Sequence, residues 1–446
     1  MAFCQDIGYL SSVQHTYDVF RRKSHHGPEH YMPSLSTLAE LYGYPFYLYD
    51  ENVIEARWKL LSAALPDFSL LYSIKTNPQL DICRFMRERG AGADAASAGE
   101  VQKALAVGFT PDMILYSAPG KSDEELEFGL ENSTVIADSY SELERIDTLA
   151  GEMARVFPVG LRINPDISFG PGPWPELLPG APAKFGVDEE SLGERADFFA
   201  GLRHIRVTGI HVFLRSQVLS HQILVRYCRH LFALAGKCGS IFGYPLEYIN
   251  FGGGFGIACG DWTNSLDLQA LRKDLSALAA LERRNLPGDI QLFAESGRFL
   301  VASAGVFVTR VEDVKISRGT TFIIVPGALN AFFRPAIMNL LGGLPGGVPG
   351  PLEPLYSNAT AHRVFMPELS DEEKERRPLQ RVTVAGKLCT SLDIVARDIE
   401  LPAPERGDIL VIDNAGAYAA SLSPFAFSGF ERPRELYRDK LGVVLL

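Results

Sequence analysis

Cysteine is scarce in this sequence, and its placement argues against two kinds of cysteine-based structure. The six cysteines lie far apart along the chain, at positions 4, 83, 228, 238, 259 and 389. No two of them form a Cys-x-x-Cys pair, and none has the cysteine–histidine spacing that is typical of a zinc site. We therefore expect neither disulfide bonds nor a bound metal.

Long apolar runs are absent as well. A helix that crosses a bilayer needs about 18 or more consecutive apolar residues, and no such stretch occurs. The first residues lack the basic segment and the apolar segment of a signal peptide. The sequence therefore predicts a cytoplasmic protein with no membrane span.

Positive charge is also limited. The 43 lysines and arginines are outnumbered by 54 aspartates and glutamates, which leaves a net charge of −11. No basic stripe is long enough to follow a phosphate backbone, so nucleic acid is not an expected partner. At 446 residues the chain exceeds the usual size of a single hydrophobic core. Two domains, or one large barrel with an appendage, are expected.

What the sequence does contain, from residue 70 to residue 300, is a repeated rhythm of a short apolar strand followed by an amphipathic helix. The eight predicted strands are 70–76, 90–96, 113–117, 134–138, 159–164, 207–214, 248–251 and 290–294. Strands that alternate with helices pair in parallel, and eight of them predict a closed (β/α)₈, TIM-like barrel. A doubly wound open sheet is the structural alternative.

The elements outside these strands complete the predicted architecture. Helices are expected at 51–65, 97–106, 122–130, 141–152 and 221–238, and the proline- and glycine-rich segment 169–183 is expected to be a loop. After residue 298 the pattern alternates as in β-strands, at 306–314, 321–325, 380–384 and 408–412. We therefore predict a barrel domain over 45–297 and an all-β domain formed by 1–44 and 298–446. Within the latter, 342–351 is predicted to be a flexible insertion and 368–377 a solvated charge run.

Polar residues gather at the predicted strand ends, where the chemistry of a barrel is located. Lys75 ends an apolar strand, and a buried ammonium is costly unless it is paired, neutralised or used chemically. It either reaches solvent or forms a covalent bond to a carbonyl cofactor. Glu295 is either structural or keeps a heterocyclic nitrogen protonated. The glycines at 252–254 allow backbone amides to approach an anion, although a tight turn has similar glycines.

The motifs at these strand ends resemble those of the fold type III pyridoxal phosphate (PLP) enzymes. Within that group they are similar to the decarboxylases of diaminopimelate, ornithine and arginine, which have an alanine-racemase-like fold. The matching segments, which include Tyr-Ser-Ile-Lys-Thr-Asn, follow the family order over nearly the whole chain, at 72–77, 94–100, 250–256, 295–298, 330–335, 389–393 and 413–418.

The resemblance implies a PLP-dependent carboxy-lyase and assigns roles to residues of this chain. It implies that Lys75 binds PLP covalently and that Glu295 pairs with the pyridinium nitrogen. It implies that Cys389 donates a proton across the interface of a homodimer with shared active sites. Further positions that it assigns to the cofactor or to the substrate's carboxylate are Asp94, Ser216, Gly252, Gly253, Gly254, Arg298 and Tyr418.

Four positions bear on the substrate, and a fifth, Phe213, bears on the cofactor ring. Phe213 stands where the family has a ring-stacking histidine, and Arg215 stands where it has a small glycine. Arg215 either points outward into solvent or adds a cation for an acidic substrate. Thr390 replaces the acidic residue that holds a distal amine, and Met338 replaces an expected tyrosine. Because Arg334 matches the family's carboxylate-binding arginine, the pocket is predicted to suit a distal carboxylate better than a distal ammonium.

This pattern is similar to that of decarboxylases in siderophore and secondary-metabolite pathways. We therefore expect a substrate such as citryl-diaminopropionate or citryl-serine, with meso-diaminopimelate as the alternative. An amino-acid racemase on the same barrel and a catalytically inactive homologue that acts as a binding protein are less favoured, because the chain retains both Lys75 and Cys389.

Overall fold

The computed structural model describes residues 34–167, 182–213, 215–258, 265–286, 288–342 and 361–446. The chain divides into two compact units. One, here called the barrel unit, comprises Lys59–Gly256 and Leu266–Gly297. The other, here called the β unit, comprises Met1–Trp58, Ile257–Ser265 and Arg298–Leu446. Of the predicted elements, residues 1–33, most of the loop 169–183 and most of the insertion 342–351 lie outside the described residues.

The barrel unit contains a closed ring of parallel strands. Along the chain these strands are β2 (Ser69–Ser73), β3 (Gly92–Ala95), β4 (Ile114–Ser117), β5 (Thr134–Ala137), β6 (Phe157–Asn164), β8 (Ile205–His211), β9 (Tyr248–Asn250) and β10 (Gln291–Ser296). Their order in the sheet is β5-β4-β3-β2-β10-β9-β8-β6, and pairing of β5 with β6 closes the ring. The short strand β7 (Val187–Asp188) pairs with β6. The predicted (β/α)₈ barrel is confirmed, because an open sheet has no pairing between its two end strands.

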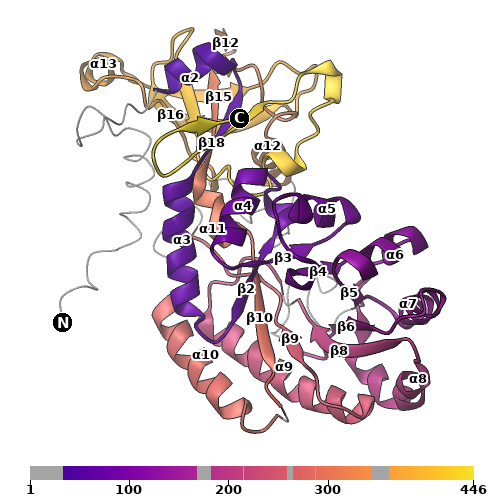
Figure 1. The fold of residues 1–446 in the computed structure, drawn as a ribbon. Helices are drawn as coiled ribbons and strands as arrows, with labels where there is room; N and C mark the ends of the chain where they lie inside the picture. Colours follow the sequence, from indigo (N-terminus) through magenta and orange to yellow (C-terminus); the bar gives the residue numbers. More distant parts are fainter. Residues whose placement is uncertain (1–33, 168–181, 214, 259–264, 287, 343–360) are drawn as a thin grey trace. The chain divides into compact units, whose positions relative to one another are not determined.

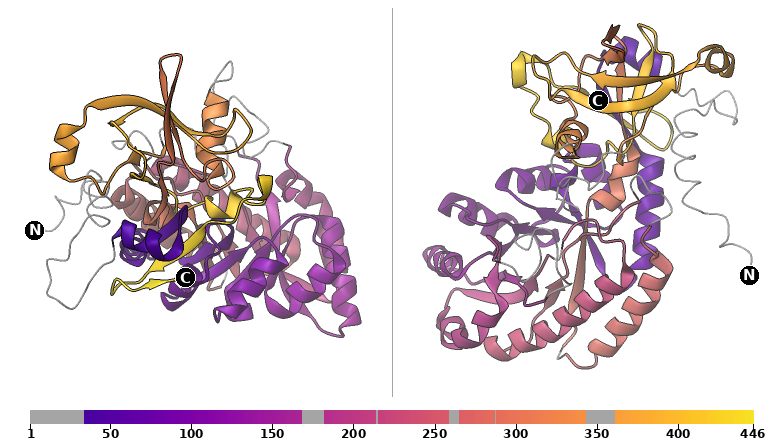
Figure 2. Two further views of the ribbon diagram at one scale, coloured as in Figure 1. Left: turned by 90° about the horizontal axis from the view of Figure 1, so that it is seen from above. Right: turned by 180° about the vertical axis from the view of Figure 1, so that it is seen from behind.

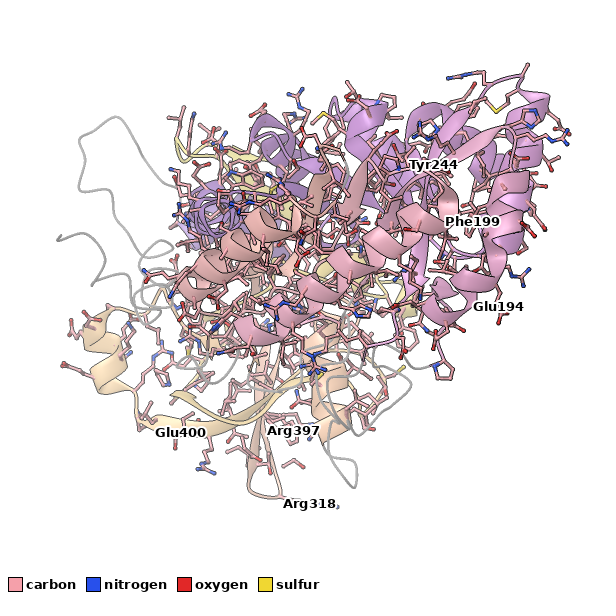
Figure 3. All side chains as sticks on the ribbon, turned by 90° about the horizontal axis from the view of Figure 1, so that it is seen from below. Glu194, Phe199, Tyr244, Arg318, Arg397 and Glu400 are labelled. Atoms are coloured by element: carbon pink, nitrogen blue, oxygen red, sulfur yellow. The ribbon has the colours of Figure 1, made fainter. Side chains whose placement is uncertain are left out.

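Helices surround the barrel strands (Figure 1). They are α4 (Leu80–Glu88), α5 (Ala98–Ala106), α6 (Asp123–Asn132), α7 (Tyr140–Glu152), α8 (Ala196–Gly201), α9 (His221–Phe242) and α10 (Leu268–Glu282). Serine hydroxyls accept a hydrogen bond from the first turn of several helices, as Ser97 does for α5 and Ser122 for α6. An aromatic cluster packs α8 against the end of α9: Phe199 lies 4.4 Å from Phe242 between ring centroids, and Tyr244 follows beside them (Figure 3).

The barrel interior is shaped by one large side chain against two glycines. Tyr248 of β9 is buried in a cluster with Leu71, Leu115 and Ile136 of other strands. A Cβ atom on Gly209 of β8 would lie only 2.2 Å from the Tyr248 ring. A Cβ atom on Gly160 of β6 would lie 2.3 Å from its hydroxyl. The Tyr248 ring therefore fits only because neither glycine has a side chain.

The β unit contains two sheets. The first has the order β14-β17-β11-β1-β18-β19 and consists of β1 (Phe46–Asp50), β11 (Gly305–Arg310), β14 (Val364–Phe365), β17 (Ile409–Ile412), β18 (Arg434–Arg438) and β19 (Val444–Leu445). The second has the order β12-β13-β15-β16 and consists of β12 (Asp313–Ser317), β13 (Thr320–Ile324), β15 (Leu379–Ala385) and β16 (Ile394–Pro402). Figure 2 shows the long β12–β13 hairpin, and Figure 3 labels Arg318 in its turn.

Short helices complete the β unit: α2 (Leu35–Tyr42), α11 (Arg298–Val301), α12 (Phe333–Gly342) and α13 (Asp371–Arg376). The helix α3 (Glu51–Ala64) begins in this unit and ends in the barrel unit. The predicted charge run 368–377 thus contains the helix α13, which a Ser370–Glu373 capping box initiates. No described helix of either unit is long and apolar enough to cross a bilayer.

The strand β1 lies within the range predicted for the barrel domain, but it pairs in a sheet of the β unit. The barrel domain was predicted to begin at residue 45, but β1 pairs antiparallel with β11 and parallel with β18. All five residues of β1 are buried in that sheet. A short, continuously apolar strand suits a barrel and a buried sheet equally well, so its pattern alone could not assign it.

The contact between Gly209 and Tyr248 predicts a sharp packing effect. Gly209→Ala should lower the melting temperature of the protein, because overpacking of a core costs about 1–3 kcal/mol. Gly201→Ala, at a position where a Cβ atom would meet nothing within 4 Å, should leave it nearly unchanged. Tyr248→Leu added to Gly209→Ala should recover part of the loss. A Gly209→Ala variant that melts like the wild type would contradict this account of the barrel interior.

Candidate active site

Lys75 lies at the carboxyl end of the strand β2, in the short 3₁₀ helix η1 (Ile74–Thr76). Its Nζ is 2.5 Å from Oδ2 of Asp94 on the neighbouring strand β3. The carboxylate of Asp94 is buried, whereas 42% of the Lys75 side chain is exposed. Lys75 is therefore both paired with a carboxylate and accessible to a ligand, and its covalent bond to a cofactor stays a prediction. A lysine with an adjacent carboxylate and an open face can act as a nucleophile once its proton has moved.

Glu295 is a buried carboxylate at the end of β10, and two side chains from neighbouring strands hold it. Its Oε1 accepts a hydrogen bond of 2.8 Å from Asn250 Nδ2 at the end of β9. The same oxygen lies 3.1 Å from Nε2 of His211 at the end of β8. The other ring nitrogen of His211 lies 3.2 Å from the Ser117 hydroxyl of β4. Four strand ends thus converge on one carboxylate.

This environment favours the charged form of Glu295. Burial by itself raises the pKa of the carboxyl group, but the charge and hydrogen bond of His211, the charge of Lys75 and the hydrogen bond of Asn250 outweigh it. The net effect is a lowered pKa. Glu295 can therefore act as a permanent anion beside a cationic group of a ligand.

The glycines after β9 form a turn with no room for side chains. Gly252 and Gly254 have positive φ angles of 62° and 103°. A Cβ atom would lie 2.4 Å from Val212 O at Gly252, 2.8 Å from Glu295 O at Gly253 and 2.0 Å from Arg215 O at Gly254. Only glycine permits this backbone, and its bare amide groups suit an anion such as a phosphate. The residues present thus fit a phosphate-bearing cofactor.

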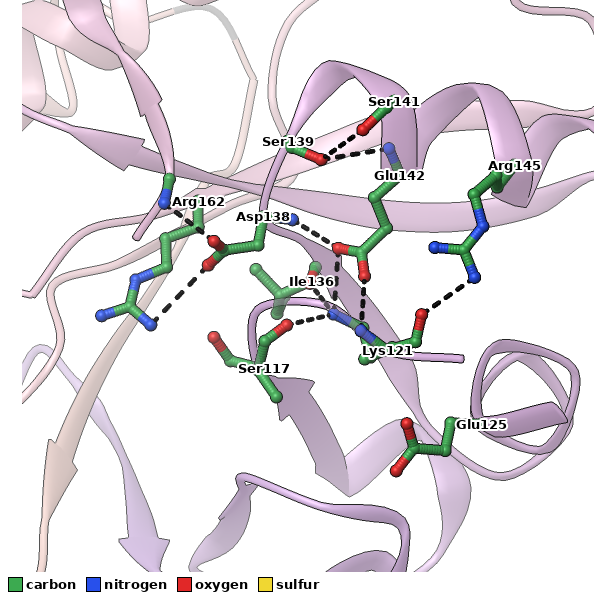
Figure 4. A network of polar contacts seen from close by, with 12 residues as sticks. Ser117, Lys121, Glu125, Ile136, Asp138, Ser139, Ser141, Glu142, Arg145 and Arg162 are labelled. Atoms are coloured by element: carbon green, nitrogen blue, oxygen red, sulfur yellow. Dashed lines mark hydrogen bonds and ion pairs between the residues drawn. The ribbon is translucent and has the colours of Figure 1, made fainter. Parts of the chain in front are cut away.

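A second charged group lies at the ends of β5 and β6. Nη1 of Arg162 is 3.9 Å from Oδ1 of Asp138, and Oδ2 of Asp138 accepts a hydrogen bond of 3.0 Å from Gly186 N (Figure 4). Burial lowers the pKa of Arg162, while the carboxylates of Asp138, Glu295 and Asp94 raise it. Arg162 therefore belongs to the same electrostatic set as Glu295.

Behind this group lies a buried ion pair that joins three elements (Figure 4). The Lys121 side chain is fully buried, and its Nζ donates to Ala118 O at 2.6 Å, to Ile136 O at 2.9 Å and to Glu142 Oε2 at 3.1 Å. Glu142 Oε2 also accepts a hydrogen bond of 2.6 Å from Asp138 N. All three ammonium protons have acceptors, so the pair fixes the chain just before Asp138.

Sequence reasoning missed His211, Asn250 and Arg162 as members of this site. Asn250 stands inside a matched segment and could have been found there. His211 lies within the predicted strand 207–214, but a role was predicted for Phe213, two residues later, and not for His211. Arg162 lies at a polar position near the end of a strand, and only the closure of the barrel brings it near Asp138.

In the β unit, Arg298 and Tyr418 lie together. The Arg298 guanidinium is buried, and its Cζ is 5.0 Å from the centroid of the Tyr418 ring. Arg298 opens the short helix α11, and Tyr418 has a positive φ of 51°. The two residues that were predicted to bind the cofactor or a carboxylate from this part of the chain are therefore neighbours.

Arg334 lies elsewhere in the β unit and is fully buried. Its Nη2 donates to Asn414 O at 3.1 Å and lies 3.3 Å from His362 Nε2. His362 Nδ1 lies 2.9 Å from Asp413 O, which fixes Nε2 as the acceptor for Arg334. Burial, followed by the charge of Arg334, lowers the pKa of His362 well below its ordinary range. Met338, one turn further along α12, is buried too.

Cys389 and Thr390 lie on a loop between β15 and β16 that one buried carboxylate organises. Asp393 Oδ1 accepts from Leu329 N at 2.7 Å, and Asp393 Oδ2 accepts from Leu388 N at 2.8 Å. Cys389 is exposed, with a free thiol. The Thr390 hydroxyl accepts from Leu392 N at 3.3 Å, which closes the turn after Cys389.

The structure thus brings the predicted residues together in separate groups. In the barrel unit, Lys75, Asp94 and Glu295 form one electrostatic set and the glycine turn packs against Glu295. In the β unit, Arg298 contacts Tyr418, and the Cys389 loop is a third group. Across the described ranges, no cluster of three or more histidine, cysteine or acidic side chains is arranged to hold a metal ion.

Comparisons with known proteins place these groups in context. The family described as "Pyridoxal-dependent decarboxylase, pyridoxal binding domain" matches residues 51–302. The L-glutamyl-[acyl-carrier protein] decarboxylase of Niallia circulans is 32% identical over 91% of this chain and 91% of its own length. The diaminopimelate decarboxylase of Methanothermobacter thermautotrophicus is 32% identical over 90% of this chain and 87% of its own length.

Solved structures agree with these sequence matches. The diaminopimelate decarboxylase of Helicobacter pylori, complexed with L-lysine, is 27% identical to this chain and has a TM-score of 0.75. The match covers 92% of this chain and 95% of that one.

The Lys121–Glu142 pair predicts a characteristic double-mutant result. Lys121→Met and Glu142→Gln each leave one buried charge without its counter-charge, which costs about 3–5 kcal/mol, or on the order of 10 °C in the melting temperature of a domain of this size. The double variant should be more stable than either single variant. Arg381→Met, which breaks an exposed pair with Glu400, should have little effect. If the two losses simply add, the pair is not coupled.

The lowered pKa of Glu295 predicts how its contribution to stability depends on pH. An acid whose pKa is lowered in the folded state stabilises the protein fully above its ordinary pKa of 4.5, and this stabilisation is lost as the pH falls from there toward the folded value. The difference in melting temperature between wild type and Glu295→Gln should therefore be constant near neutral pH and shrink below pH 4.5. Glu131→Gln, at an exposed position on α6, is the control. A difference that persists unchanged at pH 3 would contradict the expectation.

Proposed function

The chain belongs to the pyridoxal-dependent decarboxylases, and we propose that it removes the α-carboxylate of an L-amino-acid conjugate whose far end is acidic and bears no free ammonium. PLP is the cofactor, and when bound it accepts the electron pair that carbon dioxide leaves behind. Citryl-diaminopropionate and citryl-serine are substrates of this kind. The products are carbon dioxide and an amine.

The proposed function assigns several residues to the cofactor. Lys75 binds it covalently, and the amides of Gly252, Gly253 and Gly254 receive its phosphate. The remaining residues assigned to the cofactor are Asp94, Phe213, Ser216, Glu295, Arg298 and Tyr418. Phe213 can stack on a ring but cannot donate a hydrogen bond to it.

Two assignments concern protons. Glu295 keeps the ring nitrogen charged, and the contacts with His211 and Asn250 support this role because they favour its ionised form. Cys389 delivers the proton that replaces the carboxylate at Cα. Its exposed thiol suits a role at an interface, so we propose a homodimer in which each subunit lends Cys389 to the other.

Thr390 is the observation that carries the substrate proposal. A buried distal ammonium requires a carboxylate partner, and a threonine hydroxyl cannot neutralise its charge. The Thr390 hydroxyl also accepts a hydrogen bond from its own turn. Arg334 supports the proposal less directly than the sequence suggested, because it is fully buried against His362 and Asn414.

The names of the relatives bear on the alternatives. The Niallia relative acts on a glutamyl group joined to a carrier protein, which is an amino acid conjugate. The Methanothermobacter relative acts on diaminopimelate, so meso-diaminopimelate decarboxylation is the second candidate. Racemase activity and an inactive homologue gain no support, because the relatives are named decarboxylases.

A substrate panel tests the proposal. Release of carbon dioxide should be measured in parallel with citryl-diaminopropionate, citryl-serine, meso-diaminopimelate, lysine and ornithine. We expect a kcat/KM for a citryl conjugate at least tenfold above that for meso-diaminopimelate. Efficient turnover of meso-diaminopimelate would contradict the proposed substrate class.

Three variants sharpen this test. Lys75→Ala should lose both turnover and the visible absorbance of the bound cofactor, whereas Lys103→Ala, at an exposed position on α5, should keep both. Thr390→Glu should raise the relative activity toward meso-diaminopimelate, because it supplies a carboxylate for the distal ammonium. If Thr390→Glu leaves the preference unchanged, residue 390 does not select the substrate.

A further inference from the structure

Arg215 is an arginine at the edge of the glycine turn. The segment that follows β8 runs alongside the turn. Val218 N donates to Gly254 O at 2.8 Å, and Gly256 N donates to Val218 O at 3.0 Å. Val218 and Phe255 also pair as a parallel bridge. Two backbone hydrogen bonds thus lock the chain beside Arg215 to the glycines.

The backbone of Arg215 itself touches the turn. A Cβ atom on Gly254 would lie 2.0 Å from Arg215 O and 3.7 Å from Ser216 Cα. The contact is therefore closer than any residue other than glycine would allow. Hydrogen bonds hold the segment after β8 against the glycine turn. The backbone of Arg215, from which its side chain extends, is therefore positioned next to the glycine amides.

The charge of Arg215 has no counter-charge in the part of the chain that the structure describes. Its Nε is buried and makes no hydrogen bond to any described residue, and no described carboxylate lies within ion-pair distance of its guanidinium. Two other arginines with little exposure illustrate the contrast: Arg438 pairs with Asp50 and Arg377 with Asp408. A buried guanidinium donor without an acceptor is costly, so this arrangement suits an acceptor that a ligand supplies.

We propose that Arg215 and the glycine turn form a site for an anionic group, a phosphate or carboxylate, in which the guanidinium supplies the charge and the glycine amides supply neutral donors. Arginine suits such a group because it binds planar or tetrahedral oxyanions through two parallel N–H donors. The anion has two possible sources, the phosphate of the cofactor and an acidic group of the substrate. The assignment to an acidic group of the substrate rests on the proposed function. The existence of the anion site does not.

Equilibrium binding tests the site without relying on turnover. Affinities of the full-length apoprotein for PLP and for pyridoxal, which lacks the phosphate, should be measured by visible absorbance. The affinity of the PLP-loaded protein for citrate, as an anionic probe, should be measured by calorimetry. The variants are Arg215→Gly, Arg215→Gln and Arg215→Lys. Arg206→Gln is the matched control, since Arg206 lies near the start of β8, the strand that precedes Arg215, and its half-exposed guanidinium is 3.7 Å from the Glu247 carboxylate.

Each outcome is decisive. A loss of tenfold or more in PLP affinity in Arg215→Gly and Arg215→Gln, with pyridoxal affinity unchanged, assigns the site to the cofactor phosphate. Unchanged PLP affinity with a tenfold or greater loss in citrate affinity assigns it to a substrate acid. In both cases Arg215→Lys should retain part of the affinity, which a purely structural role would not predict. If all variants bind all three probes like Arg206→Gln, the site is overturned, whatever the substrate panel shows.

Discussion

The burial of the Glu295 carboxylate is the constraint on which the candidate site depends. A buried charge is tolerated only when hydrogen bonds and opposite charge replace its hydration. In this protein those partners come from three other strands, through Asn250, His211 and, further back, Ser117. Parallel strands make this possible, because their carboxyl ends all reach the same rim of the barrel. The barrel therefore has to be closed for the site to exist.

The same rim requires an unusual backbone. The turn that follows β9 lies so close to Glu295 and to the segment after β8 that side chains are excluded at Gly252 and Gly254. Bare amides then remain for an anion, while Lys75 and Asp94 lie at the ends of β2 and β3. Lys75, Glu295 and the glycine turn, to which we assign covalent attachment, ring charge and phosphate binding, thus belong to different strands.

A buried ion pair also helps to fix the geometry of the barrel rim. Lys121 and Glu142 have no access to a ligand, yet their buried pair fixes the chain before Asp138, which faces Arg162. A fully hydrogen-bonded pair of this kind defines one geometry, because any displacement leaves a buried charge unsatisfied. Family motifs do not mark these residues. Their importance follows from the three elements that they join.

Local patterns in the sequence predicted most elements of the barrel. The eight barrel strands and five helices were placed correctly because apolar periodicity and serine caps are properties of neighbouring residues. The order of the motifs made Lys75, Glu295 and the glycines candidates for the site for the same reason. The strand β1 was not among the predicted strands, and its short apolar run would not have shown which sheet it joins.

The sequence by itself determined the fold class, the cofactor and the decarboxylase family, because the strand–helix repeat and the short motifs consist of consecutive residues. Only the tertiary structure decided which side chains meet. It paired Lys75 with Asp94, surrounded Glu295 with His211 and Asn250, buried Arg334 against His362, and left Arg215 beside the glycine turn without a counter-charge among the described residues. These contacts join residues up to 94 positions apart, as between Ser117 and His211. No local pattern encodes such distances, because they arise when the barrel closes.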